Sequence, residues 1–267
     1  MCLILFAAGA HPRFPLIVAA NRDESYARPA ARAAFWADHP NVYGGRDLEH
    51  GGTWLGLARN GRFAAITNYR QGQRFADALR SRGALTRDYL TGLQNTSEYL
   101  RDVEQRRTEY HGYSLIVGQP DHLYFHSNRA NGIQPIAPGV HGLSNHLLDE
   151  PWPKVERGIA ALSSLLGAAE SAISQALFEL LADRTPAPDP LLPSTGLAFE
   201  RERAHSASFI EGETYGTRAS TVLLISVDGS ALYCERTYGP HGALLGISEQ
   251  RFQLDCGITT TAAPAGV

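Results

Sequence analysis

The start of the chain constrains the fold most, because two short apolar runs there are separated by a loop containing glycine and proline. The first run covers residues 1–7, and the second starts at Pro15 and ends in the polar segment Asn-Arg-Asp-Glu at residues 21–24. Apolar runs of this length, bounded by Gly and Pro, are typical of strands buried on both faces. Pairing the two runs as a hairpin brings the first residues of the chain close to these four polar residues.

Cys2 carries chemistry that depends on its position. Removal of Met1, expected before a small residue, leaves Cys2 with both a thiol and a free α-amine. A nucleophile whose base is its own N-terminal amine is a known catalytic arrangement. The pKa of an α-amine lies near ~7.7–8.0 and that of a thiol near ~8.5, which suits this proton transfer. The alternative is that Cys2 is a small buried hydrophobe.

Strand alternation orders the polar residues that end the second run. If the strand persists, Asn21 and Asp23 face one way and Arg22 faces the other. We therefore expect one face to present Asn21 and Asp23 to Cys2. For Arg22 and Glu24 the alternative is a structural ion pair.

Further motifs follow in a fixed order from Cys2 to Arg218. Together with Cys2 and Asn-Arg-Asp-Glu they are Gly-Gly-Thr-Trp54-Leu-Gly at 51–56, Ala-Ile-Thr-Asn68-Tyr at 65–69, Gly-Leu-Ser-Asn145 at 142–145 and Tyr-Gly-Thr-Arg218 at 215–218. On these motifs the chain resembles the NRDE family, which includes the transport and Golgi organisation protein 2 homologues. That family in turn resembles the N-terminal nucleophile hydrolases.

The resemblance implies an α+β fold, a four-layer αββα sandwich of two antiparallel sheets. It implies a single domain over residues 1–256, followed by a flexible tail at 257–267. The implied catalytic residues are Cys2, Asp23, Asn68, Asn145 and Arg218, and the implied binding residues are Asn21, Arg22, Glu24 and Trp54.

The resemblance also implies a role for each of these residues, and the chemistry of its side chain is compatible with that role. The carboxylate of Asp23 orients the α-amine, and an Asn amide at 68 or 145 stabilises an oxyanion. Arg218 holds a substrate carboxylate or phosphate. The alternative for each Asn is a turn amide that bonds its own backbone.

Three functions are compatible with this resemblance. The first is a Cys2-dependent hydrolase or acyl transferase acting on an amide or a thioester. The second is a binding protein for haem trafficking, or for acyl-CoA or lipid handling, with Cys2 as an axial haem ligand. The third is an interaction protein with a vestigial pocket. We expect a small-molecule ligand and no required cofactor, with haem as the alternative ligand.

Composition excludes several other classes. A chain of 267 residues with 43% hydrophobic and 19% charged residues is typical of a globular protein. A net charge of −3 does not favour nucleic acid as a partner. Three Cys, at 2, 234 and 256, argue for a reducing compartment and against a disulfide framework or zinc site.

Neither a metal site nor a membrane segment is expected. His122 and His126 share a face of an expected strand but lack the spacing of a metal motif. No apolar run approaches the ~18 residues of a membrane helix, so we expect a cytoplasmic protein without an integral membrane segment.

The remaining pattern predicts hairpins with helices grouped near the middle of the chain. Helices are expected at 85–93, 96–107, 151–166 and 171–182, with Asn95 or Thr96 and Ser171 as N-caps. Residues 26–41 are expected to be irregular, the glycine-rich residues 44–47 to form a loop, and residues 250–255 to form a last edge strand.

Overall fold

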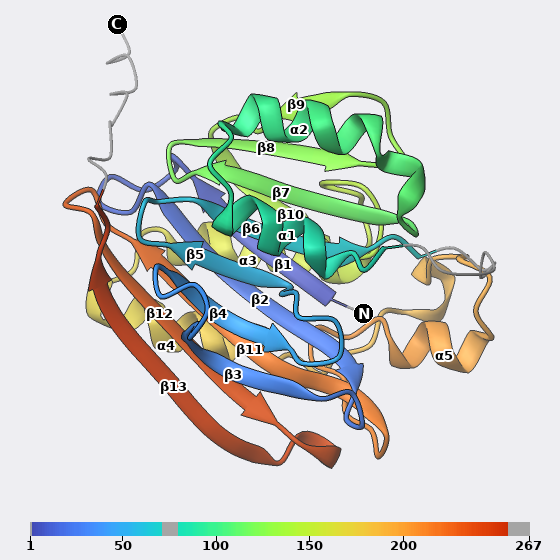
Figure 1. Cartoon of the computed structure of the whole chain (residues 1–267). Helices are drawn as coiled ribbons and strands as arrows, with labels where there is room; N and C mark the ends of the chain where they lie inside the picture. The colour runs from blue at the N-terminus through green and yellow to red at the C-terminus, as the bar shows by residue number, and fades with distance from the viewer. Residues whose placement is uncertain (1, 71–79, 256–267) are drawn as a thin grey trace, which may run out of the picture.

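The computed structural model describes residues 2–70 and 80–255, and within them the chain forms four layers (Figure 1). Two antiparallel sheets lie face to face, and helices cover the outer face of each. This confirms the α+β αββα sandwich that the family resemblance implied. The expected tail at 257–267 lies outside the described residues. None of the described helices combines the length and apolar character needed to cross a membrane.

The first sheet contains the beginning of the chain at its centre. Its six described strands lie in the spatial order β10 (Gly139–Leu143), β1 (Cys2–Ala8), β2 (Leu16–Ser25), β11 (Tyr215–Ile225), β12 (Ser230–Tyr238) and β13 (Leu244–Gln253). β1 and β2 form the expected hairpin, with Cys2 opposite Arg22 and Ala8 opposite Leu16. The last strand lies at the sheet edge, as expected, but begins six residues before residue 250.

The second sheet is a meander in which neighbours in sequence are neighbours in space. Its seven described strands are β3 (Ala30–Phe35), β4 (Val42–Asp47), β5 (Leu55–Ala58), β6 (Phe63–Asn68), β7 (Tyr113–Gln119), β8 (His122–Ser127) and β9 (Ile133–Pro135). Short connections explain the order from β3 to β6 and from β7 to β9, because antiparallel neighbours need only a tight turn between them. β6 and β7 also pair, although the segment that carries α1 and α2 separates them in sequence.

Helices cover both outer faces. α1 (Gly83–Thr91) and α2 (Thr96–Gln105) lie over the second sheet, while α3 (Pro153–Leu165) and α4 (Glu170–Leu181) lie over the first. The remaining helical elements are α5 (Phe199–Ala204) and the 3-10 turns η1 (Arg107–Glu109), η2 (Asp189–Leu191) and η3 (Pro240–Gly242). α5 follows the proline-rich segment and was not expected from the sequence.

Apolar side chains fill the three spaces between layers. Phe6, Val18 and Leu223 of the first sheet pack between the sheets, while Leu5 and Ile17 point to α3 and α4. This alternation explains the two continuous apolar runs at the chain start, since both faces of β1 and β2 are buried. Fully burying a side chain of this size contributes about 1.5–3 kcal/mol.

The prediction that residues 26–41 are irregular and that 44–47 form a loop is wrong. Both segments contain strands, β3 and β4, which pair with each other. The glycines in β4 serve close packing rather than a turn, because a Cβ on Gly45 would lie 2.0 Å from the Trp54 ring. The Trp54 ring that fills this space belongs to another motif. The glycines at 44 and 45 therefore suggest a loop when read from the local sequence alone.

Helix boundaries agree with expectation within a few residues, with one error in capping. Asn95 caps α2 through a reciprocal capping box with Glu98, which confirms the predicted start. Ser171 does not cap α4, whose N-cap is Ala169 without a side-chain cap bond. α1 starts two residues earlier than expected, at Gly83, which packs closely against Gly52. A Cβ at residue 52 would lie 2.4 Å from the Gly83 carbonyl carbon.

A buried carboxyl group joins the two sheets. Glu235 on β12 is 0% exposed, and its Oε1 accepts a hydrogen bond of 2.7 Å from the Ala33 N–H on β3. The β3–β4 register shifts between Ala31 and Ala34, which leaves the Ala33 N–H for this contact. Burial raises the pKa of Glu235 to about 7.

We expect Glu235→Gln to stabilise the protein above pH 7 and to flatten its pH dependence. Between pH 4.5 and about 7 the unfolded carboxyl loses its proton while the folded one keeps it, so wild-type stability falls as pH rises. Gln keeps the acceptor for Ala33 and cannot ionise. The free energy of unfolding of Glu235→Gln, measured with denaturant, should exceed that of wild type by about zero at pH 4.5 and by about 3 kcal/mol above pH 7.

The exposed neighbour Glu249 provides a matched control, since Glu249→Gln should leave the curve unchanged. Parallel stability curves for wild type and Glu235→Gln over this pH range would contradict the account.

Candidate functional site

The thiol of Cys2 lies between the two sheets on the same face as Arg22. Cys2 and Arg22 are directly opposite in the β1–β2 register, and opposite residues present their side chains to one face. Alternation along β1 places Cys2 with Ile4 and Phe6, both of which pack between the sheets. The expectation that Asn21 and Asp23 would share the face of Cys2 is therefore wrong.

Asn21 lies on the helix-covered face of β2, where it has a structural role. Its Nδ2 donates to the carbonyls of Leu181 at 2.9 Å and Ser208 at 2.8 Å. Its Oδ1 accepts from the Ser220 hydroxyl at 2.6 Å. These contacts fasten β2 to the end of α4 and to the segment before β11.

Asp23 is buried and lines one cavity together with Cys2. The carboxyl is 3% exposed, and Oδ1 accepts a hydrogen bond of 2.6 Å from the Thr217 hydroxyl. Burial raises the pKa of Asp23, while the nearby Lys154 ammonium and the Thr217 bond act in the opposite direction. The carboxyl thus lies close to the chain start, although on the other face of β2 from the thiol.

The cavity has a volume of about 310 Å³ and lies where β1 and β2 meet the start of α1. Cys2 is only partly buried in its wall. The lining residues are mostly polar: Cys2, Arg22, Asp23, Glu24, Arg28, Asp47, His50, Thr53, Trp54, Ile66, Asn68, Arg80, Ser81, Arg82, Gly83 and His111. Six of the nine residues proposed for the site from sequence are among them.

Asn145 holds the beginning of β1. Its Oδ1 accepts a 3.1 Å hydrogen bond from the Cys2 N–H, and its Nδ2 donates 2.9 Å to the Asn68 carbonyl. The neighbouring Ser144 hydroxyl donates to the Cys2 carbonyl at 3.0 Å. The Asn145 motif therefore ties the first residue of β1 to the end of β6 in the other sheet.

The two Asn residues differ in what they offer a ligand. Asn145 is 2% exposed, and both ends of its amide bond the protein. Asn68 is exposed at the end of β6, and it lines the cavity. Of the two amides predicted as oxyanion donors, Asn68 has the one that is accessible from the cavity.

Arg22 stacks on Trp54 in the cavity wall. The guanidinium carbon lies 4.3 Å from the Trp54 ring centroid, a cation–π contact. Glu24 lines the same cavity, and its Oε1 accepts from the Ser25 N–H at 2.9 Å. In the described part of the chain the two side chains form no ion pair, so the structural alternative considered for them is wrong.

Burial is the largest influence on the thiol, and it raises the pKa of Cys2. The Asp23 carboxylate raises the pKa further. The Asp23 backbone N–H and the Arg22 guanidinium lower it. The thiol is therefore protonated at neutral pH and needs a base to become a nucleophile.

Arg218 lies outside the residues that line the cavity. It is the extra residue of a β-bulge, because Thr217 pairs with Asp23 and Ala219 pairs with Arg22. Its Nη1 donates to the carbonyls of Ser25, at 3.0 Å, and Arg28. The bulge turns the Arg218 side chain towards the turn at residues 25–28. Its contacts within the described residues therefore do not support the predicted role of Arg218 in holding a substrate anion.

Lys154 is a component of the site that sequence reasoning missed. It is 2% exposed, its Nζ donates to the His205 carbonyl at 3.1 Å, and burial lowers its pKa to about 8. The Asp23 carboxylate opposes that shift. A signal did exist, because Lys154 falls on the buried stripe of α3 with Gly158 and Leu162.

No metal centre is formed by the residues that the structure describes. In 2–70 and 80–255, no group of at least three His, Cys, Asp or Glu is arranged to hold a metal ion.

Comparison with known proteins identifies the class and then the family. The fold and the cavity define an αββα protein with a cysteine at the start of its central hairpin. Residues 1–240 match the family described as Transport and Golgi organisation 2, and the chain belongs to this family.

Relatives from animals cover most of the chain. The Transport and Golgi organization protein 2 homologue of Bos taurus is 36% identical over 264 residues, with 89% of this chain and 93% of the relative covered. The Homo sapiens homologue is 33% identical, covering 89% and 93%. The Drosophila melanogaster Transport and Golgi organization protein 2 is 30% identical, covering 91% and 95%.

Solved structures with a similar fold have low sequence identity. A Caenorhabditis elegans orthologue of N-acylethanolamine-hydrolyzing acid amidase has a TM-score of 0.47 and 13% identity, covering 84% of this chain and 92% of its own. A conjugated bile acid hydrolase mutant from Clostridium perfringens has a TM-score of 0.45 and 10% identity, covering 97% and 95%.

We expect Asn145→Ala to destabilise the fold by about 2 kcal/mol, because it leaves the Cys2 N–H and the Asn68 carbonyl without their partner. The free energy of unfolding in urea measures this. Asn131 is exposed, so Asn131→Ala is a matched control with a change within about 0.5 kcal/mol. Equally small changes in unfolding free energy for both variants would contradict the role of Asn145 in holding the start of β1.

Proposed function

We propose that this protein is a Cys2-dependent acyl-transfer enzyme that hydrolyses an amide or a thioester. The observation that carries the proposal is the placement of Cys2. Its thiol lines a cavity, and its main-chain nitrogen is held by the Asn145 Oδ1 at 3.1 Å. Removal of Met1 turns that nitrogen into an α-amine.

The α-amine supplies the base that the protonated thiol needs. It takes the thiol proton, and the sulfur attacks the substrate carbonyl carbon to form a tetrahedral intermediate. Collapse breaks the carbon–nitrogen or carbon–sulfur bond, and the leaving group takes the proton back from the ammonium. The acyl group remains on Cys2 as a thioester, which water hydrolyses with the amine again acting as base.

Neighbouring residues orient these atoms. Asn145 Oδ1 accepts one proton of the α-amine, and the Asp23 carboxylate lies close enough to influence the thiol. The exposed amide of Asn68 is the candidate donor to the oxyanion. In other enzymes, removal of one such donor costs about 2.7–4 kcal/mol of transition-state stabilisation.

A binding protein without turnover is the second candidate. It is favoured by the Asn145 amide, whose donor already bonds the Asn68 carbonyl, and by the raised pKa of the thiol. In that case haem or an acyl-bearing ligand occupies the cavity, with Cys2 as the sulfur ligand of haem. The three dispersed cysteines favour a reducing compartment, and we place either activity in the cytoplasm.

Cys2→Ala should abolish hydrolysis, by at least about a thousandfold in rate, because the other described thiol, Cys234, is buried in β12. The fold should survive with a loss of about 1 kcal/mol, since one atom is removed at the start of a strand. A panel of amide and thioester substrates measures the rate, and Cys234→Ala is the control that should retain it.

A haem absorbance titration on the same proteins separates the two candidates. Hydrolysis unchanged in Cys2→Ala would reject the nucleophile. Absence of hydrolysis in wild type, with a sulfur-dependent haem spectrum lost on mutation, would replace the enzyme by the carrier.

A further inference from the structure

We propose that Arg22, Arg82 and the N-terminal end of α1 form an anion-binding subsite beside Cys2. The subsite takes a carboxylate or phosphate group carried by the ligand. This inference deepens the proposed function and rests on it only in identifying the ligand as the acyl substrate. The presence of an anion site can be tested without turnover.

Arg22 is a buried charge that forms no ion pair with any residue of 2–70 or 80–255. It is 7% exposed, lines the cavity and stacks on Trp54. Among the described residues no side chain or carbonyl accepts a hydrogen bond from its guanidinium. Burying a charge without an ion pair is costly, and the nearby Glu24 and Asp47 carboxylates offset only part of that cost, so a ligand anion in the cavity would offset more of it.

Arg82 adds a second cation at an unusual place, the N-cap of a helix. α1 has nine residues, no acidic residue in its first turn and no side-chain cap bond. The positive end of a helix dipole normally attracts Asp or Glu and repels a cation. Arg82, Ser81 and Gly83 line the cavity, so the helix end and the guanidinium face the same space as Arg22.

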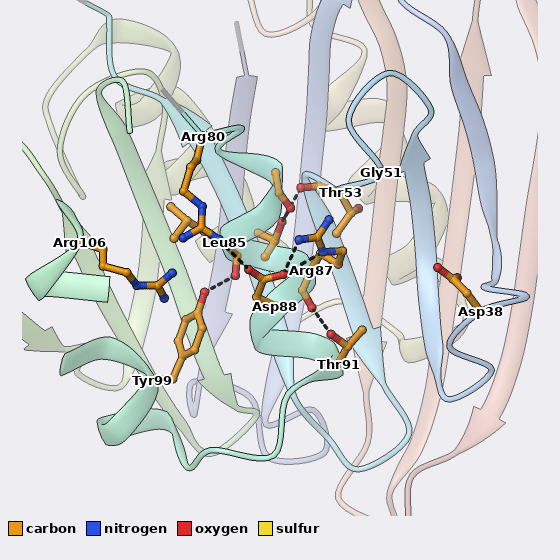
Figure 2. Close-up of polar contacts among 12 residues, drawn as sticks. Asp38, Gly51, Thr53, Arg80, Leu85, Arg87, Asp88, Thr91, Tyr99 and Arg106 are labelled. Carbon is orange, nitrogen blue, oxygen red and sulfur yellow. Dashed lines mark hydrogen bonds and ion pairs between the residues drawn. The ribbon is translucent and has the colours of Figure 1, made fainter. Parts of the chain in front are cut away.

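The other arginines of the cavity are already neutralised. Arg28 pairs with Asp47 at 2.7 Å and with Glu49 at 3.0 Å. Arg80 pairs with Glu109 at 3.2 Å and extends towards Asp88 on α1, 4.0 Å away (Figure 2). Arg82, by contrast, donates only to a carbonyl, that of Gly112 at 3.2 Å, within the described residues.

Three carboxylates also line the cavity, and none of them forms an ion pair with Arg22 or Arg82. Asp47 pairs with Arg28 and lies close enough to favour the charged form of Arg22. Asp23 bonds Thr217, and Glu24 bonds the Ser25 N–H. Glu24 lies close enough to favour the charged form of both arginines, without direct contact. The cationic excess is therefore reduced by Glu24 but remains.

The subsite lies next to the reacting sulfur. Both guanidinium groups interact electrostatically with the Cys2 thiolate. An anion held between them is therefore adjacent to a carbonyl attacked by Cys2. Guanidinium matches the two oxygens of carboxylate and phosphate in a bidentate fashion, which defines the ligand as an acyl donor with such a group near the scissile bond.

Two thiol reagents that differ in charge test this subsite. Iodoacetate is anionic and iodoacetamide is neutral, and both alkylate Cys2. Relative to the same residue in unfolded protein, we expect the native protein to favour iodoacetate by roughly tenfold. Mass spectrometry of the peptide that contains Cys2 gives both rates.

Arg82→Gln should reduce the iodoacetate rate by roughly tenfold more than the iodoacetamide rate, which falls only as far as loss of the guanidinium destabilises the thiolate. Arg101→Gln, an exposed arginine on α2, is the matched control and should change neither rate. Equal changes for both reagents, or no change for either, would overturn the subsite, because only the anionic reagent reports on it.

Competition in the wild-type protein identifies the anion. Protection of Cys2 from iodoacetate by inorganic phosphate indicates a phosphate group, and protection by acetate indicates a carboxylate. Protection by neither overturns the proposal independently of any variant. Confirmed anion selectivity with no hydrolysis in the substrate panel would keep the subsite and reject the enzyme.

Discussion

The antiparallel register between β1 and β2 is the constraint on which the site depends. It places Cys2 opposite Arg22 and sends the thiol between the sheets, while Asp23 remains on the helix-covered side. A slip of one residue would exchange these faces and move the thiol into the layer of α3 and α4. Asn145 and Ser144 hold the register at its open end, through both the N–H and the carbonyl of Cys2.

The buried and charged groups around the cavity determine which protonation state Cys2 adopts and which ligands the cavity attracts. Burial keeps the thiol protonated, so the main-chain nitrogen next to it becomes the natural base once it is an amine. The arginines that lack carboxylate partners then act on what enters the cavity. Lys154, deeply buried on the same helix-covered side of β2 as Asp23, compensates that carboxylate. On the cavity side of β2 the arginines thus act on the ligand, while on the helix-covered side Lys154 compensates Asp23.

Much of the framework could be predicted from the sequence, because it depends on local patterns. The apolar runs, the Asn95 cap and the hairpin turns specify β1, β2, α2 and the late strands without knowledge of their partners. Features that depend on distant residues could not be predicted. Gly45 accommodates the ring of Trp54, and the bulge at Arg218 turns that side chain away from the cavity. The register that pairs Cys2 with Arg22 is likewise invisible in either strand alone.

The central claim is that Cys2 acts as an N-terminal nucleophile, and rapid-quench mass spectrometry during turnover tests it most directly. The account predicts a chain that begins at Cys2 and carries one acyl group on that residue. The bond should be a thioester that forms and decays as fast as product is released. Turnover by a chain that retains Met1, or an acyl group found on Cys234 instead, would contradict it.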